Sequence, residues 1–324
     1  MARMARIERT GGPEVIQWVD VELPAPGPGE VRMRNSAVGL NFIDIYFRSG
    51  LYPTPLPSGL GGEAAGLVEA VGEGVEGFAP GDRVATFGPG RGAYSTARNL
   101  PAKILFKLPD DISEEAAAAS LLKGGTAEFL IERCARVQPG HTVLVHAAAG
   151  GVGQIAVRGL TASGAQVIAT VGHRDKVALA EAAGANHVLL SREEDVAARV
   201  RAITGGVGVD VVLDGVGKAT WEASLASAKR RGLVVSFGNA SGPVEGVNIG
   251  ALARAGSLFV TRPTMFDYYA TPEEREAGAA RLWEMLRSGA VRVDINQRFA
   301  LEDAAEAHRA LEAGKTTGST ILIP

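Results

Sequence analysis

Short apolar runs alternate with amphipathic stretches through the middle of the chain. Five of these runs are rich in Val, Ile and Leu and are long enough for one buried strand each: "TVLVHA", "QVIATV", "HVLL", "VDVVLDGV" and "GLVVSFGN". The intervals between them carry apolar residues at helical spacing, at residues 151–163, 175–183, 193–204 and 221–228. Strands and helices that alternate in this order predict an α/β fold with a doubly wound parallel sheet.

The two ends of the chain follow different patterns. Residues 1–122 contain alternating stretches such as "GEVRMRNSAVGL", broken by Gly and Pro, which predicts a β-rich unit with many turns. Ser113 caps a predicted helix near the end of this region, and a second helix is expected up to about residue 137. After residue 265 the predicted order is helix, strand, helix and strand. We therefore expect a doubly wound domain of residues 123–265, inserted into a β-rich domain made from residues 1–122 and 266–324.

Composition narrows the possible classes of function. The net charge of −3, from 33 Lys and Arg against 36 Asp and Glu, provides no global basic field for nucleic acid or an anionic membrane. The chain has no signal-peptide segment and no run of about 18 apolar residues, so a soluble, cytoplasmic protein is expected. Cys134 is the single cysteine and the five histidines show no ligand spacing, so no metal site is expected.

The stretch "HAAAGGVGQIA", residues 146–156, lies between a predicted strand and a predicted helix. The dinucleotide fingerprint G-x-G-x-x-G would place glycines at 148, 150 and 153, whereas this chain has Ala148, Gly150 and Gly153. Gly150 would let the backbone approach a pyrophosphate, Gly153 would let the helix pack closely, and the first helical N–H groups would face the anion. The alternative is a glycine-rich turn that binds no ligand.

Charges about twenty residues after the glycine turn bear on which dinucleotide would bind. NAD sites place an Asp or Glu near the end of the second strand, where it bonds the ribose 2′-hydroxyl. This chain has "ATVGHRDK" there, with Gly172, His173, Arg174 and Lys176, and we interpret Asp175 as a helix cap. Cations in this position suit a 2′-phosphate, so the sequence favours NADPH over NADH. The alternative is that Arg174 and Lys176 are solvated residues at the start of a helix.

Several longer motifs occur along the whole chain in the order "GLNFIDIYFRSGLYP", "LPSGLGGEAAG", "HAAAGGVG", "RRGLVVSFGNASG" and "GSLFVTRP". With these motifs the chain resembles the zinc-independent NADPH:quinone oxidoreductases, the zeta-crystallin-like branch of the medium-chain dehydrogenases/reductases, and the bacterial enzymes in particular. The resemblance implies a GroES-like catalytic domain, a Rossmann domain that binds NADPH, and an active-site cleft between them. It also implies a homodimer joined through the cofactor domains, with "SLFVT" as the edge strand.

The resemblance implies roles for individual residues as well. At the nicotinamide end of the cofactor it places Asn41, Phe42, Ile43, Asp44 and Tyr46, with Tyr52 on the loop that follows. Around the pyrophosphate it places Gly150, Gly151, Val152 and Gly153, with Thr126 near the nicotinamide ribose or the phosphates and Lys123 within reach of the site. Phe237, Gly238 and Asn239 would pass along the nicotinamide, and Lys176 would bind the 2′-phosphate, with Gly172, His173 and Arg174 beside it.

The chain departs from the family pattern at position 191. Bacterial members carry a tyrosine in a motif like "NYREED", whereas this chain has Ser191 in "LSREED". An aromatic partner for the adenosine phosphate is therefore missing, and Arg174 or Ser191 itself is expected to compensate. Zinc-dependent members of the superfamily would need Cys and His near Asn41 and in the "GGE" stretch, and this chain has Leu40 and Gly62 there. No catalytic metal is expected.

The implied reaction is the reduction of a quinone by NADPH without a metal or flavin, in which the cofactor supplies the redox chemistry. The developing oxyanion needs a hydrogen-bond donor. Tyr46 and Asn41 are the best candidates, with Tyr52 as a second donor or a wall of the pocket, and Asp44 is interpreted as a helix cap. Two alternatives remain open: reduction of activated C=C bonds in alkenals or enones, and an NADPH-binding protein with a structural or RNA-binding role.

Overall fold

The computed structural model describes residues 1–88 and 91–324, and the chain divides into two units. The first unit contains residues 1–122 and 293–324, and the second contains residues 123–292. The helix α2, Glu114–Glu128, begins in the first unit and ends in the second. Each unit has its own β-structure and its own apolar core.

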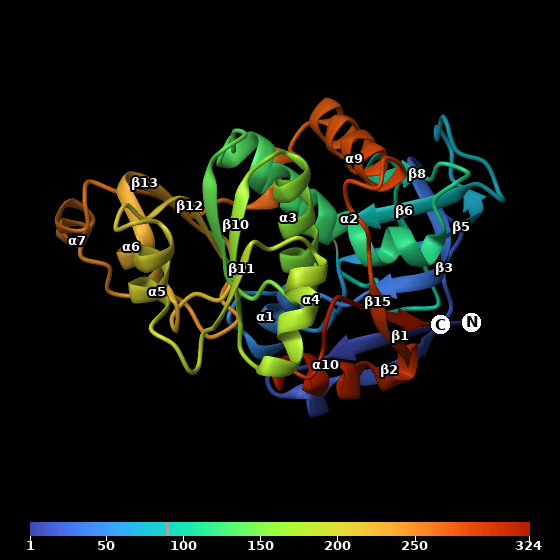
Figure 1. The fold of residues 1–324 in the computed structure, drawn as a ribbon. Helices are drawn as coiled ribbons and strands as arrows, with labels where there is room; N and C mark the ends of the chain where they lie inside the picture. Colours follow the sequence, from blue (N-terminus) through green and yellow to red (C-terminus); the bar gives the residue numbers. More distant parts are fainter. Residues whose placement is uncertain (89–90) are drawn as a thin grey trace. The chain divides into compact units, whose positions relative to one another are not determined.

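The second unit contains a six-stranded sheet in the order β11-β10-β9-β12-β13-β14, in which all neighbouring strands are parallel. The helices α3 and α4 lie on one side of this sheet, and α5 and α6 lie on the other (Figure 1). The prediction of a doubly wound parallel sheet is thus confirmed. The strands are β9 Thr142–Val145, β10 Gln166–Val171, β11 His187–Leu190, β12 Val209–Asp214, β13 Ala228–Ser236 and β14 Phe259–Thr261. The helices are α3 Gly151–Ala162, α4 Val177–Ala182, α5 Val196–Ile203, α6 Trp221–Ser227, α7 Gly250–Arg254, α8 Met265–Tyr268 and α9 Pro272–Arg287.

The core of this sheet explains why its strands are nearly continuous apolar runs. A parallel sheet with helices on both faces buries both faces of its central strands. Leu144 of β9, Ile168 of β10 and Val212 of β12 are all buried in one cluster. The apolar faces of α5 and α6 contribute Val200 and Leu225 to the same cluster.

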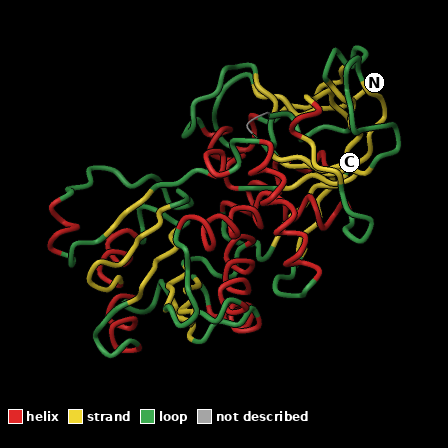
Figure 2. The backbone as a smooth tube through the Cα atoms, turned by 90° about the horizontal axis from the view of Figure 1, so that it is seen from above, coloured by secondary structure: helices red, strands yellow, loops and turns green. Residues whose placement is uncertain are grey.

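The first unit is rich in strands and contains both chain ends, as Figure 2 also shows. Its larger sheet has the order β15-β16-β3-β5-β6-β8, with β7 also paired to β3, and a small second sheet has the order β2-β1-β4. The strands are β1 Ala2–Ile7, β2 Gln17–Val21, β3 Glu30–Gly39, β4 Ser58–Gly59, β5 Glu63–Val71, β6 Arg83–Phe87, β7 Ala97–Pro101, β8 Leu105–Lys107, β15 Ile295–Ala300 and β16 Ser319–Ile323. Its other helices are α1 Phe42–Ser49 and α10 Ala304–Glu312.

Residues 266–292 lie in the second unit, whereas the expected boundary placed them with the chain ends. The physical reason is the packing of α9 and the segment before it. Leu282 of α9 fills the space over Gly124, where an added Cβ would lie 2.4 Å from the leucine side chain. The hydroxyl of Tyr269 donates to the carboxylate of Glu128 at 2.8 Å.

The predicted pair of helices between residues 113 and 137 is one continuous element. The α-helix α2 passes directly into a π-helical turn, Phe129–Cys134. Phe129, Leu130 and Ile131 are all buried, so the wider turn keeps three successive apolar side chains inside the unit. Sequence periodicity of 3.6 residues does not predict such a turn, because a π-helical turn shifts the buried face.

Candidate functional site

The loops at the carboxyl edge of the second unit's sheet come together where the strand order reverses. The strand β10 lies on one side of β9, and β12 lies on the other side. In open parallel sheets of this kind, ligands bind at such a switch point, beyond the carboxyl ends of the strands. The segments that follow β9, β12 and β13 are the glycine turn 146–150, the loop 215–220 and the segment 237–239.

The glycine turn has the geometry that its sequence predicts, although its first glycine is replaced. Ala147 adopts the left-handed conformation, with φ of +53°. Ala148 is buried, and its N–H donates to the carbonyl oxygen of Thr170 at 2.9 Å. The left-handed position therefore lies one residue before Ala148, and position 148 has no need of a glycine.

Gly150 and Gly153 keep the backbone of the turn accessible. Gly150 is the extended N-cap residue of α3, with φ of −80° and ψ of 174°. A Cβ atom at position 153 would lie 2.4 Å from the carbonyl oxygen of Ala147 and 2.7 Å from the Cα atom of Ala148. Only glycine fits here, because both neighbours are backbone atoms that cannot move aside. The first-turn N–H groups of α3 have no preceding helical carbonyl to bond and can bind an anion.

The segment Phe237–Asn239 packs directly on the loop that follows β12. The Phe237 N–H donates to the carbonyl oxygen of Asp214 at 2.8 Å, and its ring covers Gly215. A Cβ atom at position 238 would lie 2.2 Å from the carbonyl oxygen of Gly215. These close contacts hold the two segments together at the edge of the sheet.

A buried polar network links the glycine turn to the loop after β12. The Ser224 hydroxyl donates to Asp214 at 2.6 Å, because an ionised carboxylate can only accept. Ser224 Oγ therefore accepts from Nε2 of His146 at 3.1 Å, and Nδ1 of His146 faces the Thr170 hydroxyl at 3.1 Å. Burial lowers the pKa of His146, so the imidazole is neutral. Sequence reasoning missed this role of His146, and its position directly before the turn was the only indication.

The predicted adenosine-phosphate residues lie at the ends of β10 and β11, but two of their side chains have other partners. Arg174 pairs with Glu193 at 2.6 Å, and both side chains are largely exposed. Ser191 Oγ donates to the carbonyl oxygen of Val171 at 3.2 Å. Arg174 and Ser191 were expected to compensate for the missing aromatic side chain. Both side chains already bond to another group of the protein.

Arg192 is the basic residue that sequence reasoning missed in this region. Its Nη1 lies 2.9 Å from Nε2 of His173, and a Cβ at position 172 would lie 3.6 Å from its Nε. Lys176 is half-buried, and its pKa is lowered first by burial and also by the positive charge of Arg192, while Asp175 opposes the shift. The positive charges of Lys176 and Arg192 therefore interact near the end of β10.

Lys123 and Thr126 both lie on α2. Lys123 is buried, and the Thr126 hydroxyl lies 3.6 Å from the sulfur atom of Met265. The predicted residues of the second unit thus fall into two sets, one at the carboxyl edge of the sheet and one on α2.

In the first unit, the predicted residues cluster around the start of α1. Asn41 is the N-cap residue, and its N–H donates to the Asp44 carboxylate at 2.9 Å in a capping box. This confirms the interpretation of Asp44 as a cap. The Asn41 side-chain amide donates to Glu63 Oε2 at 2.8 Å, and Glu63 Oε1 accepts from the Leu122 N–H at 2.6 Å. Glu63 is fully buried and was not identified from the sequence.

Aromatic rings line up along α1 and the loop after it. The rings of Tyr46 and Tyr52 are 5.1 Å apart between centroids, and the Tyr52 N–H donates to the Tyr46 carbonyl at 3.0 Å. The ring centroids of Phe42 and Tyr46 are 6.3 Å apart. The ring of Phe47 packs edge-on to that of Tyr52, with 5.7 Å between the centroids. Asn41 is therefore the N-cap of the helix that carries Ile43 and Tyr46, and Tyr52 packs against Tyr46 from the loop that follows.

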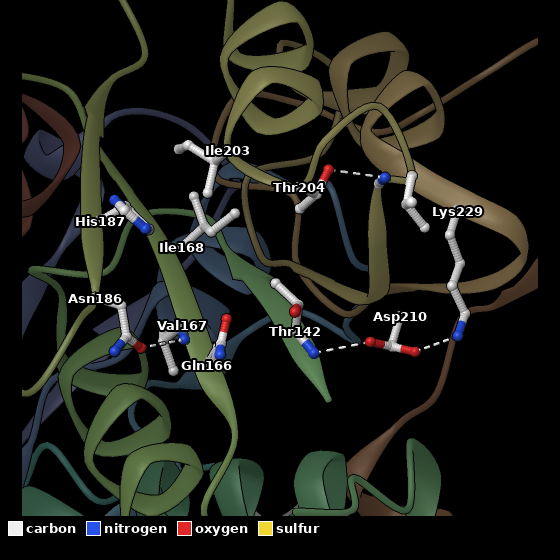
Figure 3. Close-up of a pocket in the computed structure, with 12 residues that line it drawn as sticks. Thr142, Gln166, Val167, Ile168, Asn186, His187, Ile203, Thr204, Asp210 and Lys229 are labelled. Atoms are coloured by element: carbon white, nitrogen blue, oxygen red, sulfur yellow. Dashed lines mark hydrogen bonds and ion pairs between the residues drawn. The ribbon is translucent and has the colours of Figure 1, made fainter. Parts of the chain in front are cut away.

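A cavity of about 300 Å³ opens at the amino edge of the second unit's sheet, away from the glycine turn (Figure 3). Several of its polar groups bond to one another. Asp210 pairs with Lys229 and accepts from the Thr142 N–H at 2.8 Å, and Asn186 Oδ1 accepts from the Val167 N–H at 2.7 Å. No predicted site residue lines this cavity.

Metal-binding clusters and membrane-spanning helices are both missing from residues 1–88 and 91–324. No group of three or more His, Cys, Asp or Glu side chains in these ranges is arranged to hold a metal ion. No helix in the same ranges is both long and apolar enough to cross a membrane.

Comparison with known proteins identifies both units. Residues 27–110 match the alcohol dehydrogenase GroES-like domain, and residues 151–282 match the zinc-binding dehydrogenase family. The expected GroES-like assignment of the first unit is confirmed.

Several relatives match the chain over nearly its whole length. The chain is 51% identical to a quinone oxidoreductase of Pseudomonas aeruginosa, with 100% of both proteins covered. It is 41% identical to a 2-haloacrylate reductase of a Burkholderia species. That alignment covers 100% of this chain and 99% of the reductase. The chain is 48% identical in sequence to Escherichia coli quinone oxidoreductase, whose crystal structure was solved in complex with NADPH. The two structures superpose with a TM-score of 0.97, and the match covers 99% of this chain and 100% of that one. Likeness at this level over the whole length shows that the chain belongs to the quinone oxidoreductase family of the medium-chain dehydrogenases/reductases.

Proposed function

We propose that this protein is an NADPH-dependent quinone reductase. The observation that carries the proposal is the glycine turn, in which the backbone contacts at position 153 leave no room for a side chain. A turn of this kind, at the switch point of a parallel sheet and at the start of a twelve-residue helix, suits a pyrophosphate. The NADPH complex of the Escherichia coli relative supports the same cofactor.

The chain's own residues fit NADPH along the carboxyl edge of the sheet. Gly150, Gly151, Val152 and Gly153 would hold the pyrophosphate through the backbone. Phe237, Gly238 and Asn239 would lie along the nicotinamide, and Lys123 and Thr126 would serve the ribose and phosphate groups. The 2′-phosphate end is cationic, because β10 ends at Val171 and Lys176 follows without an Asp or Glu at the strand end.

The proposed acceptor residues lie in the first unit. When bound, NADPH supplies a hydride from its nicotinamide ring. Glu63 accepts one N–H of the Asn41 amide and fixes the plane of that amide, so its orientation does not depend on substrate. Tyr46 would donate its phenolic proton to the reduced quinone oxygen, and Tyr52 would support the ring of Tyr46 by packing. Phe42 and Ile43 would shield the reacting groups from water.

The proposal is tested by measuring the oxidation of NADPH and of NADH with a panel of acceptors. We expect kcat/KM for 1,4-benzoquinone and a naphthoquinone to be higher than for a small enone, and NADPH to be preferred over NADH. The 2-haloacrylate reductase among the relatives favours a second candidate, the reduction of activated C=C bonds. Turnover of the enone without turnover of any quinone would support that candidate, and a preference for NADH would contradict the cofactor assignment.

Replacement of Tyr46 by phenylalanine removes the proposed donor but keeps the ring contacts. We expect kcat for quinones to fall roughly 10- to 100-fold, the loss of one hydrogen bond to a developing charge, with a smaller change in KM. Tyr52→Phe is the matched control, because it keeps the 5.1 Å ring contact and removes a hydroxyl from the neighbouring residue. A Tyr46→Phe enzyme with the kcat of the original protein would rule out this role.

We also propose that the protein is a homodimer joined through the second unit. The strand β14 is an edge strand of the parallel sheet, and Phe259 on it is 63% exposed. An exposed edge strand with an apolar side chain offers backbone hydrogen bonds to a second copy. Sedimentation velocity at micromolar concentration would give twice the chain mass of 33.6 kDa, and a monomer would contradict the proposal.

A further inference from the structure

Arg192 follows β11 and places its guanidinium beside the end of β10. Its Nη1 lies 2.9 Å from Nε2 of His173, and its Nε would lie 3.6 Å from a Cβ atom added to Gly172. The guanidinium therefore lies beside Gly172 and the side chain of His173. In sheets of this class, the ribose of a bound dinucleotide lies at the end of this strand.

We propose that Arg192, together with Lys176, binds the 2′-phosphate of NADPH and that this pair determines the preference for NADPH. This inference rests on the proposed function and adds a residue to it. Arg192 would then bind the adenosine phosphate in place of Arg174 or Ser191, the residues that the sequence favours.

The charges around the strand end separate Arg192 from the neighbouring arginine. Arg174 is paired with the carboxylate of Glu193 at 2.6 Å, so a phosphate would have to compete with an existing ion pair. The partner of Arg192 is an imidazole, which is a weaker competitor than a carboxylate. Arg192 can therefore turn to an incoming phosphate without breaking a salt bridge.

The contact with His173 uses one donor of Arg192. An arginine N–H can only donate, so Nε2 of His173 accepts. A guanidinium carries five N–H donors in a planar fork, and the imidazole takes one of them. Phosphate oxygens can accept from the fork in a bidentate way, which also fixes the orientation of the 2′-phosphate.

Lys176 completes the charge at this end of the site. The positive charge of Arg192 disfavours the charged form of Lys176, with Asp175 the opposing carboxylate. Two cations that repel each other in the free protein are both stabilised when a dianion binds near them. A 2′-hydroxyl carries no charge and gives no such gain, so the pair discriminates between the two cofactors.

The test measures the binding of 2′,5′-ADP and of 5′-AMP by isothermal titration calorimetry, without any catalysed reaction. We expect Arg192→Gln to weaken 2′,5′-ADP roughly 10- to 100-fold, as for the loss of a charge-assisted hydrogen bond, and to leave 5′-AMP within about twofold. Arg174→Gln is the matched control in the same loop region, and its effect on 2′,5′-ADP should stay within about threefold. Arg192→Lys should recover part of the affinity, because it restores the charge without the fork.

The remaining outcomes distinguish the role of Arg192 from the assignment of NADPH and from the proposed reaction. An Arg192→Gln variant that binds 2′,5′-ADP like the original protein, or that loses 5′-AMP to the same degree, overturns the inference and leaves the proposed function standing. Failure of the original protein to prefer 2′,5′-ADP over 5′-AMP overturns both this inference and the assignment of NADPH. The expected binding pattern in a protein that reduces no quinone supports Arg192 and rejects the proposed reaction.

Discussion

Replacement of Asp214 by alanine is expected to destabilise the second unit by roughly 3–5 kcal/mol, because several buried donors lose their acceptor together. Asp214 is fully buried. Its Oδ1 accepts from the N–H groups of Val216 and Gly217 at 2.9 and 3.0 Å, and its Oδ2 accepts from the Ser224 hydroxyl. The Thr220 hydroxyl lies 2.8 Å from both oxygens. Urea denaturation of the variant and the original protein measures the difference in free energy of unfolding.

The same substitution should weaken NADPH binding, because Asp214 holds the loop on which Phe237 and Gly238 pack. Ser224→Ala is the graded control. It removes the link to His146 and leaves the backbone N–H bonds of the loop in place, so we expect a loss of about 1–2 kcal/mol. An Asp214→Ala protein within about 1 kcal/mol of the original stability would show that water replaces the carboxylate.

The fold follows from local patterns that a single sequence displays. The apolar runs of β9, β10 and β12 are buried on both faces, so their sequences contain little polar alternation and predict a parallel sheet. Gly153 could also be predicted, because the spacing of the turn requires a glycine where the helix meets the backbone. These features depend on neighbours only a few residues away in the chain.

The polar networks could not be predicted, because their members are far apart in the sequence. His146 meets Ser224, which is 78 residues later, and Asn41 meets Glu63 across 22 residues. No periodicity in the sequence relates such pairs. Arg192 could not be predicted for a different reason. The cations that follow β10 in the sequence include Arg174, whereas the pairing with β11 brings a residue from the next loop to the same place.

The boundary of the second unit also depends on contacts between segments that are far apart in the sequence. The pattern of α9 predicts an amphipathic helix correctly, but a helical pattern does not say which sheet the helix covers. The assignment depends on Gly124, whose missing side chain admits Leu282, and on the bond from Tyr269 to Glu128. Both contacts join segments that are more than 100 residues apart in the sequence.

Replacement of His308 by glutamine is expected to flatten the pH dependence of stability between about pH 6.5 and pH 5. Burial, and then the positive charge of Arg48, lower the pKa of His308 to about 3. Arg48 Nη1 donates to Nδ1 at 3.1 Å, so Nε2 carries the proton and donates to the Tyr94 hydroxyl at 2.9 Å. Tyr94 in turn donates to Asp44 at 3.1 Å, which ties this neutral histidine to the start of α1.

His308 has a lower pKa in the folded protein than in the unfolded chain. In the unfolded chain a histidine titrates near pH 6.5, so below that pH the unfolded state binds a proton that the folded state excludes. The free energy of unfolding therefore falls as the pH is lowered, by up to about 1.4 kcal/mol per pH unit from His308 alone, or roughly 2 kcal/mol between pH 6.5 and pH 5. His308→Gln removes this contribution, although the lowered pKa of His146 leaves a residual slope of the same sign. His187→Gln, at an exposed position, should keep the original slope. Equal slopes in urea denaturation for the His308→Gln and original proteins would show that His308 is protonated in the folded protein at pH 5.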